Sequence, residues 1–137
     1  MENFKIIKTL ESTSSRLSKE EIILNEMKNQ NEVFFKGMSL AYNKLLTFGV
    51  KQVPKSESNG DGLEWEEFSQ LADKLISRKL TGHAARDLII DLIKSSKTDQ
   101  WNDWYRRILI KDLRCGVSEK TVNNVAKKMN LKLRKKS

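Results

Sequence analysis

The sequence contains few of the residues on which catalytic and metal centres depend. Its 137 residues include one cysteine, one histidine and one proline. Cys115 has no partner for an intramolecular disulfide, and together with His83 it cannot supply the four ligands of a structural zinc site. A single histidine also excludes a His-Glu-x-x-His motif and leaves serine nucleophiles with only His83 as a base. We therefore expect no catalytic residue, no metal ion and no cofactor in this chain.

Phosphate-binding glycine motifs and long apolar stretches are also absent. No Gly-Lys-Ser/Thr occurs, and Gly60-x-Gly62 is followed by Trp65, where a dinucleotide fingerprint requires glycine. The uncharged stretches are too short to span a membrane, and the first ten residues have no apolar run like that of a signal peptide. These absences predict an intracellular protein without a membrane partner. For a viral protein, this would be the cytoplasm of the host cell.

Positive charge is concentrated in the last third of the chain. Residues 103–137 contain eleven Lys and Arg against three Asp and Glu, so the formal net charge of +8 resides there. A basic region beside a neutral body favours a polyanionic partner such as nucleic acid. The alternative is a solvated basic surface without a partner.

Apolar residues recur at helical spacing along nearly the whole chain. The clearest stripe contains Phe34, Met38, Ala41, Leu45 and Phe48 and predicts a helix from an Asn31 cap to Gly49. Other helices are expected to begin near residues 2, 18, 64, 83, 98 and 118, and residues 56–62 are expected to form a mobile loop. The predicted fold is an all-α compact bundle of six or seven helices. The expected organisation is one helical domain over 1–129, followed by a basic tail or the start of an interdomain linker over 130–137.

Two helix–glycine turn–helix units are related by a shift of 34 residues. The first contains Arg78-Lys79-Leu80-Thr81-Gly82-His83, and the second runs from Arg106 through Gly116 to Thr121. In each, cations stand beside a glycine turn and a new helix start, which Thr81 or Ser118 is expected to cap, and the free N–H groups of that start favour phosphate. We interpret Asp112 as a residue that pairs with and orients Arg114 or another arginine, and the three tryptophans as core. The repeat suggests a pseudo-twofold that would grip both strands of a duplex. The alternative is two ordinary capped hairpins.

The segments RKLTGHAA and RRILIKDLRCGVS resemble the N-terminal DNA-binding domain of ATP-dependent DNA ligases, most closely that of the T-even bacteriophage type. The resemblance extends from about Leu75 to Val125. It implies an all-helical domain that binds nicked double-stranded DNA across the minor groove. By motif position, the implied DNA contacts are Arg78, Lys79, Thr81, Gly82, His83, Arg107, Arg114, Gly116, Val117, Ser118, Lys120 and Thr121.

The Lys-x-Asp-Gly adenylation motif of ligases is missing. This chain alone is therefore not expected to be an enzyme, and ATP and magnesium are implied only for a catalytic domain outside it. The implied partners are nicked duplex DNA and the nucleotidyltransferase and oligonucleotide-binding domains of the same ligase, and the chain is expected to be a monomer. Two other functions remain open: a helix-turn-helix regulator that reads bases through Asn123 and Asn124, or a protein-interaction module for a replication partner.

Overall fold

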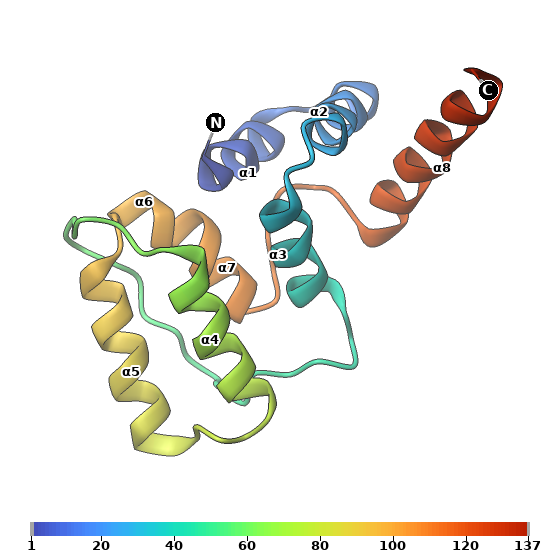
Figure 1. Cartoon of the computed structure of the whole chain (residues 1–137). Helices are drawn as coiled ribbons and strands as arrows, with labels where there is room; N and C mark the ends of the chain where they lie inside the picture. The colour runs from blue at the N-terminus through green and yellow to red at the C-terminus, as the bar shows by residue number, and fades with distance from the viewer. Residues whose placement is uncertain (1, 137) are drawn as a thin grey trace.

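The computed structural model describes residues 2–136, with side chains described through residue 130, and every regular element in this part of the chain is helical. Figure 1 shows their arrangement. The elements are α1 (Asn3–Ser12), α2 (Arg16–Lys28), α3 (Glu32–Tyr42), α4 (Trp65–Ile76), α5 (Gly82–Ser95), α6 (Thr98–Gln100), the π-helical turn η1 (Trp101–Tyr105), α7 (Arg106–Leu109) and α8 (Glu119–Lys136). Because α6, η1 and α7 are continuous, they form one helix, and the predicted all-α fold with six or seven helices is confirmed.

The helix formed by α6, η1 and α7 lies at the centre of the core. It packs against α1 and α3, and Trp101 and Trp104 are buried in it, as expected for core residues. The Phe34 ring of α3 stacks on Trp104 with ring centroids 5.8 Å apart. A Cβ atom at Gly37 would overlap the Trp104 ring, so glycine permits this close approach of α3. Trp65 is only half-buried, against the same core.

Helix boundaries follow the sequence at some positions and depart from it at others. Asn31 caps α3 as predicted, since its side chain accepts a hydrogen bond from Phe34 N at 3.2 Å. The predicted cap at Ser18 is wrong: α2 begins at Arg16, and the Ser15 hydroxyl accepts from Ser18 N at 3.3 Å. The prediction that α3 continues to Gly49 is also wrong, because the helix ends at Tyr42.

Residues 56–62 form a tethered connection, whereas the sequence predicted a mobile loop. Gly60 N and Gly62 N donate to Ser96 O and Ser95 O, both at 2.8 Å, and the Asn59 side chain accepts from Thr98 N at 2.8 Å. These bonds hold the connection against the end of α5. At the other end of the chain, α8 continues through residue 136. The backbone of residues 130–136 is thus a helical extension, and residue 137 lies outside the described residues.

The two glycine turns share local geometry, but their hairpins pack differently. Gly82 and Gly116 both have left-handed backbone, with φ of 59° and 68°. The helices α4 and α5 pack against each other, whereas α8 packs mainly against α2 (Figure 1). The 34-residue repeat therefore describes the turns better than the helix pairs. None of the described helices combines the length and apolar character needed to cross a membrane.

Candidate nucleic-acid interface

The segment between α7 and α8 reverses the chain through left-handed backbone. The φ angle is 58° at Lys111, 52° at Arg114 and 68° at Gly116. Non-glycine residues adopt this region at a cost of about 1–2 kcal/mol each, so side-chain contacts must stabilise the turn. The Asp112 carboxylate accepts hydrogen bonds from Arg114 N at 3.1 Å and from Arg114 Nε at 3.5 Å. The prediction that Asp112 orients Arg114 is therefore confirmed.

Arg107 stabilises this turn from inside. The residue is 7% exposed, and its Nη1 donates to Leu113 O at 3.0 Å. Its Nη2 lies 3.2 Å from a Glu11 carboxylate oxygen and 3.4 Å from one of Asp103. These partners occupy the guanidinium, so Arg107 mainly supports the fold, although it also lines the second basic groove described below. The Val117 side chain is also buried, while its carbonyl oxygen accepts from the Tyr42 hydroxyl.

A basic hollow of about 460 Å³ lies where the first turns of α2 and α8 meet, and none of its lining residues is acidic. Each helix start is capped by a serine: the Ser118 hydroxyl accepts from Thr121 N at 3.2 Å, as Ser15 does in α2. The first turn of a helix carries N–H groups without intrahelical partners and a partial positive charge, which favour an anion. The lining residues are Ser14, Arg16, Lys19, Gly116, Ser118, Lys120, Thr121 and Asn124.

Four of the sequence-predicted residues therefore come together in this hollow: Gly116, Ser118, Lys120 and Thr121. The sequence analysis missed the contribution of α2, including Arg16 and Lys19. Lys19 Nζ lies 3.5 Å from the Gly116 carbonyl oxygen across 97 positions of sequence. No local pattern could reveal this pairing, because it arises when α2 packs on α8.

A second basic groove has a volume of about 860 Å³, and Arg114 lines it. Gly116, two positions further along the same turn, lines the hollow, so the turn contributes to two basic depressions. Burial lowers the pKa of Arg106, and the nearby charges of Arg114 and Arg107 lower it further. The cations in this groove are close enough to repel one another, and a polyanion would relieve that repulsion. Its other cationic lining residues are Lys5, Lys8 and Lys55, and its acidic ones are Asp99 and Asp103.

The first glycine turn, between α4 and α5, lies on the surface. Lys79, Thr81, Gly82 and His83 are exposed. Thr81 is the residue preceding α5, but its hydroxyl makes no capping hydrogen bond, so the predicted side-chain cap is absent. This turn therefore offers an exposed helix start beside cations, as the sequence suggested, without the threonine cap.

Arg78, also in the first turn, is directed toward the segment that follows α3. Its Nη2 donates to Thr47 Oγ1 at 2.6 Å, and its Nη1 lies 3.3 Å from Thr47 O. A Cβ atom at Gly49, where φ is +69°, would overlap the guanidinium. The glycine therefore makes room for the arginine as well as providing the backbone conformation.

Residues 43–49 lie between the two glycine turns in space and contact an arginine or lysine from each. On one side they meet Arg78 through Thr47. On the other, Lys111 Nζ donates to the carbonyl oxygens of Leu40, Asn43 and Leu46 at 3.0, 2.8 and 2.8 Å. Figure 1 shows the chain leaving α3 and running toward the C-terminal end of α4. The structure thus joins the two turns through a third segment that the sequence did not identify as part of the site.

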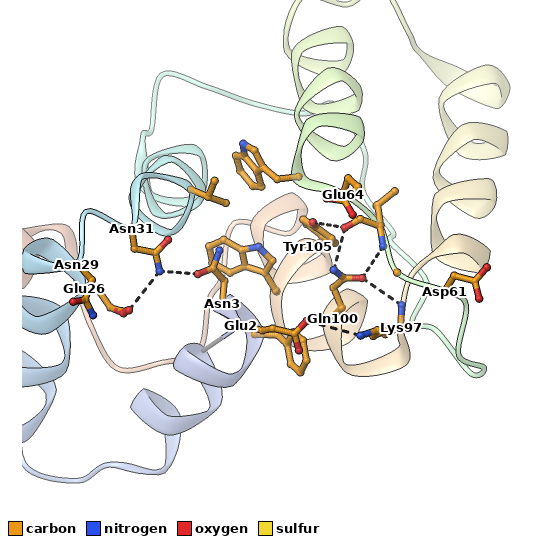
Figure 2. Close-up of a pocket in the computed structure, with 16 residues that line it drawn as sticks. Glu2, Asn3, Glu26, Asn29, Asn31, Asp61, Glu64, Lys97, Gln100 and Tyr105 are labelled. Carbon is orange, nitrogen blue, oxygen red and sulfur yellow. Dashed lines mark hydrogen bonds and ion pairs between the residues drawn. The ribbon is translucent and has the colours of Figure 1, made fainter.

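A further hollow, of about 660 Å³, has the opposite charge. Figure 2 shows the carboxylates of Glu2, Glu26, Asp61 and Glu64 around it, together with the lysine Lys97. Lys97 Nζ is 3.9 Å from a Glu2 carboxylate oxygen and is thus paired. An acidic lining of this kind repels phosphate, so this hollow is not a candidate for contact with nucleic acid. The described residues contain no group of three or more His, Cys, Asp or Glu placed to hold a metal ion.

No family model matches the chain. The DNA ligases of Enterobacteria phages T4 and T6 are each 32% identical to it over 130 residues, covering 88% of this chain and 25% of the phage enzyme. Two solved structures, called "Pmar-Lig_Pre." and "Pmar-Lig_PreS3", each superpose with a TM-score of 0.90 at 50% identity. They are matched over 93% and 95% of this chain, and over 30% of each of those chains.

The chain thus spans about a quarter of the length of the phage ligases that it matches. The sequence similarity covers 88% of this chain and the superposition 93% of it. Over most of its length, the chain is therefore a homologue of one segment of the phage DNA ligases.

Proposed function

We propose that this chain binds duplex DNA through its phosphate backbone, as the N-terminal DNA-binding segment of an ATP-dependent DNA ligase. The observation that carries the proposal is the basic hollow between α2 and α8. It combines two capped helix starts with Arg16, Lys19 and Lys120 and has no acidic lining residue. Helix starts and cations arranged in this way are suited to phosphate oxygens.

The second basic groove supports binding to more than one phosphate. Arg114 faces it together with Lys5, Lys8 and Lys55. Backbone contacts of this kind position a protein on a duplex without reading its bases. We therefore expect binding that is independent of sequence and follows the minor-groove edge of the backbone, with a preference for nicked duplex. Asn124 lines the hollow beside these cations, which fits phosphate contact as well as base reading.

The joining reaction would belong to the rest of such an enzyme. No Lys-x-Asp-Gly motif is present in this sequence, so ATP and magnesium would act in the nucleotidyltransferase domain. This segment would act as a monomer beside that domain and the oligonucleotide-binding domain. Its contribution would be to hold the DNA, which would lower the apparent KM for DNA of the joined enzyme.

The test is fluorescence-anisotropy titration of labelled nicked duplex, intact duplex and single strand across a salt series. We expect duplex binding that ignores sequence and weakens steeply with salt, with about −0.9 in the log–log slope for each phosphate contacted. The variant Lys120→Ala should weaken binding to every duplex and reduce the slope by about 1. The matched control is Lys28→Ala, at the opposite end of α2, where the lysine is exposed.

No duplex binding at low salt would overturn the proposal and favour a protein-interaction module. A strong dependence on base sequence would instead favour a helix-turn-helix regulator. Equal effects of Lys120→Ala and Lys28→Ala would remove the hollow as the contact surface while leaving general electrostatic binding.

A further inference from the structure

Leu45 is the most exposed large apolar residue in the described part of the chain, with 92% of its surface accessible. It follows α3 in a tight turn over residues 43–46, closed by a hydrogen bond from Leu46 N to Asn43 O at 3.1 Å. Single exposed apolar side chains are common on protein surfaces and need no explanation by themselves. What distinguishes Leu45 is how firmly its turn is held and what surrounds it.

The turn that presents Leu45 is rigidly held. The Asn43 side chain accepts from Leu45 N at 3.0 Å. The Lys111 ammonium donates to three carbonyl oxygens around the turn, those of Leu40, Asn43 and Leu46. The exposure of Leu45 is therefore a fixed feature of the fold.

The surroundings of the turn are polar and basic. The same segment contacts the first glycine turn through Thr47 and Arg78. Lys111 connects it to the second turn, and Lys44 beside Leu45 is exposed. An apolar protein partner would have to desolvate these cations. The minor groove of a duplex offers phosphates at its edges, and apolar sugar surfaces and base edges between them.

We propose that Leu45 enters the minor groove of the bound duplex and packs against the sugars and base edges of one step, which it partly unstacks. This inference rests on the proposed function and adds an apolar contact to its electrostatic ones. The two glycine turns would hold phosphates on either side of the residue. Leucine is among the side chains that act as wedges in minor-groove proteins.

The test compares Leu45→Ala with Val33→Ala on the whole chain. Val33 is a partly exposed apolar residue that lines the acidic hollow, which makes it a control outside the basic depressions. Anisotropy titration of nicked duplex at fixed salt should show Leu45→Ala weakening binding by about tenfold, as expected from the loss of a buried leucine side chain. Val33→Ala should leave the Kd unchanged, and Leu45→Met should retain most of the affinity. The salt slope should not change in any of the three, because no phosphate contact is removed.

A second readout reports on base stacking directly. Duplexes carrying 2-aminopurine at successive positions around the nick should show increased fluorescence at one step when the wild-type chain binds. That increase should be absent with Leu45→Ala at saturating protein. If the wild-type chain binds but Leu45→Ala matches its Kd and its 2-aminopurine signal, the wedge is wrong and the proposed function stands. If the wild-type chain does not bind DNA, both the wedge and the proposed function are wrong.

Discussion

Lys19 lies directly over the backbone of Gly116, where a Cβ atom would overlap its ammonium nitrogen. We predict that Gly116→Ala both destabilises the fold and displaces Lys19 from the basic hollow. The φ of +68° alone should cost an alanine about 1–2 kcal/mol. Urea denaturation should show this loss, and anisotropy titration should show weaker duplex binding.

The matched control for that change is Gly82→Ala in the first turn. Gly82 has a similar φ of +59°, but no atom lies within 4 Å of the Cβ position. Its conformational cost should therefore be about the same 1–2 kcal/mol, without a steric contribution. Equal losses of stability and of DNA affinity in both variants would show that the Lys19–Gly116 contact has no role of its own.

Arg107 and Arg114 should have separable roles although both belong to one basic segment. Arg107→Ala removes a buried cation from Leu113 O, Glu11 and Asp103 and should lower the free energy of unfolding by about 2–4 kcal/mol. Arg114→Glu changes an exposed side chain paired only with Asp112 and should alter stability by about 1 kcal/mol or less. DNA affinity should fall strongly in Arg114→Glu while the fold is intact. If Arg107→Ala were as stable as the wild-type chain, the buried cluster would not stabilise the turn.

Removing the Lys111 ammonium, which holds the turn over residues 43–46, should lower both stability and DNA affinity. Lys111→Met leaves three carbonyl oxygens without their donor and should cost about 1–3 kcal/mol of stability. Because the turn would then be loose, DNA binding should fall to about the level of Leu45→Ala even though Leu45 is still present. Lys44→Met, an exposed neighbour, should change stability by about 0.5 kcal/mol at most. An unchanged affinity in Lys111→Met would indicate that the turn needs no brace.

Two carboxylates that face Arg107 should affect the pH dependence of stability in opposite directions. A hydrogen bond from Lys8 holds the pKa of Glu11 below its ordinary value of 4.5, whereas burial raises the pKa of Asp103 above 3.8. Glu11 therefore contributes stability that is present above its ordinary pKa and is lost as the pH falls below it. Asp103 contributes the reverse: its stabilising effect is lost as the pH rises from its ordinary pKa through the raised one.

Glu11→Gln should accordingly flatten the loss of stability on the acid side. Asp103→Asn should make stability rise more steeply with pH just above 3.8. Urea denaturation midpoints measured over roughly pH 3 to 7 would test both slopes. Slopes that change in the same direction in the two variants would contradict the assigned shifts.

Local patterns in the sequence predicted the features that depend on neighbouring residues, namely helix faces and helix caps. Helical spacing identified the buried tryptophans Trp101 and Trp104, and side-chain chemistry identified the caps at Asn31 and Ser118. The end of α3 was missed because a lysine far along the chain, Lys111, takes the carbonyl oxygens that would have continued the helix.

Contacts between residues far apart in the sequence also limited the prediction of the site. Residues beside the glycine turns could be listed from a motif, but burial of Arg107 depends on Glu11, which α1 supplies. The α2 cations Arg16 and Lys19 are not exceptional in sequence and gain their place only when α2 packs on α8. A pattern that repeats every few residues does not contain such information.

Both N-terminal helices find their packing partners near the far end of the chain: α1 on α6 and η1, and α2 on α8. Such pairing gives the segment a high contact order, which slows folding. During synthesis, the apolar face of α1, including Ile6 and Ile7, lacks its main packing partner until residues near Trp101 have left the ribosome. Until then that face is available to chaperones and proteases. The folding of this segment is therefore completed late in synthesis, when its last helices bury its first.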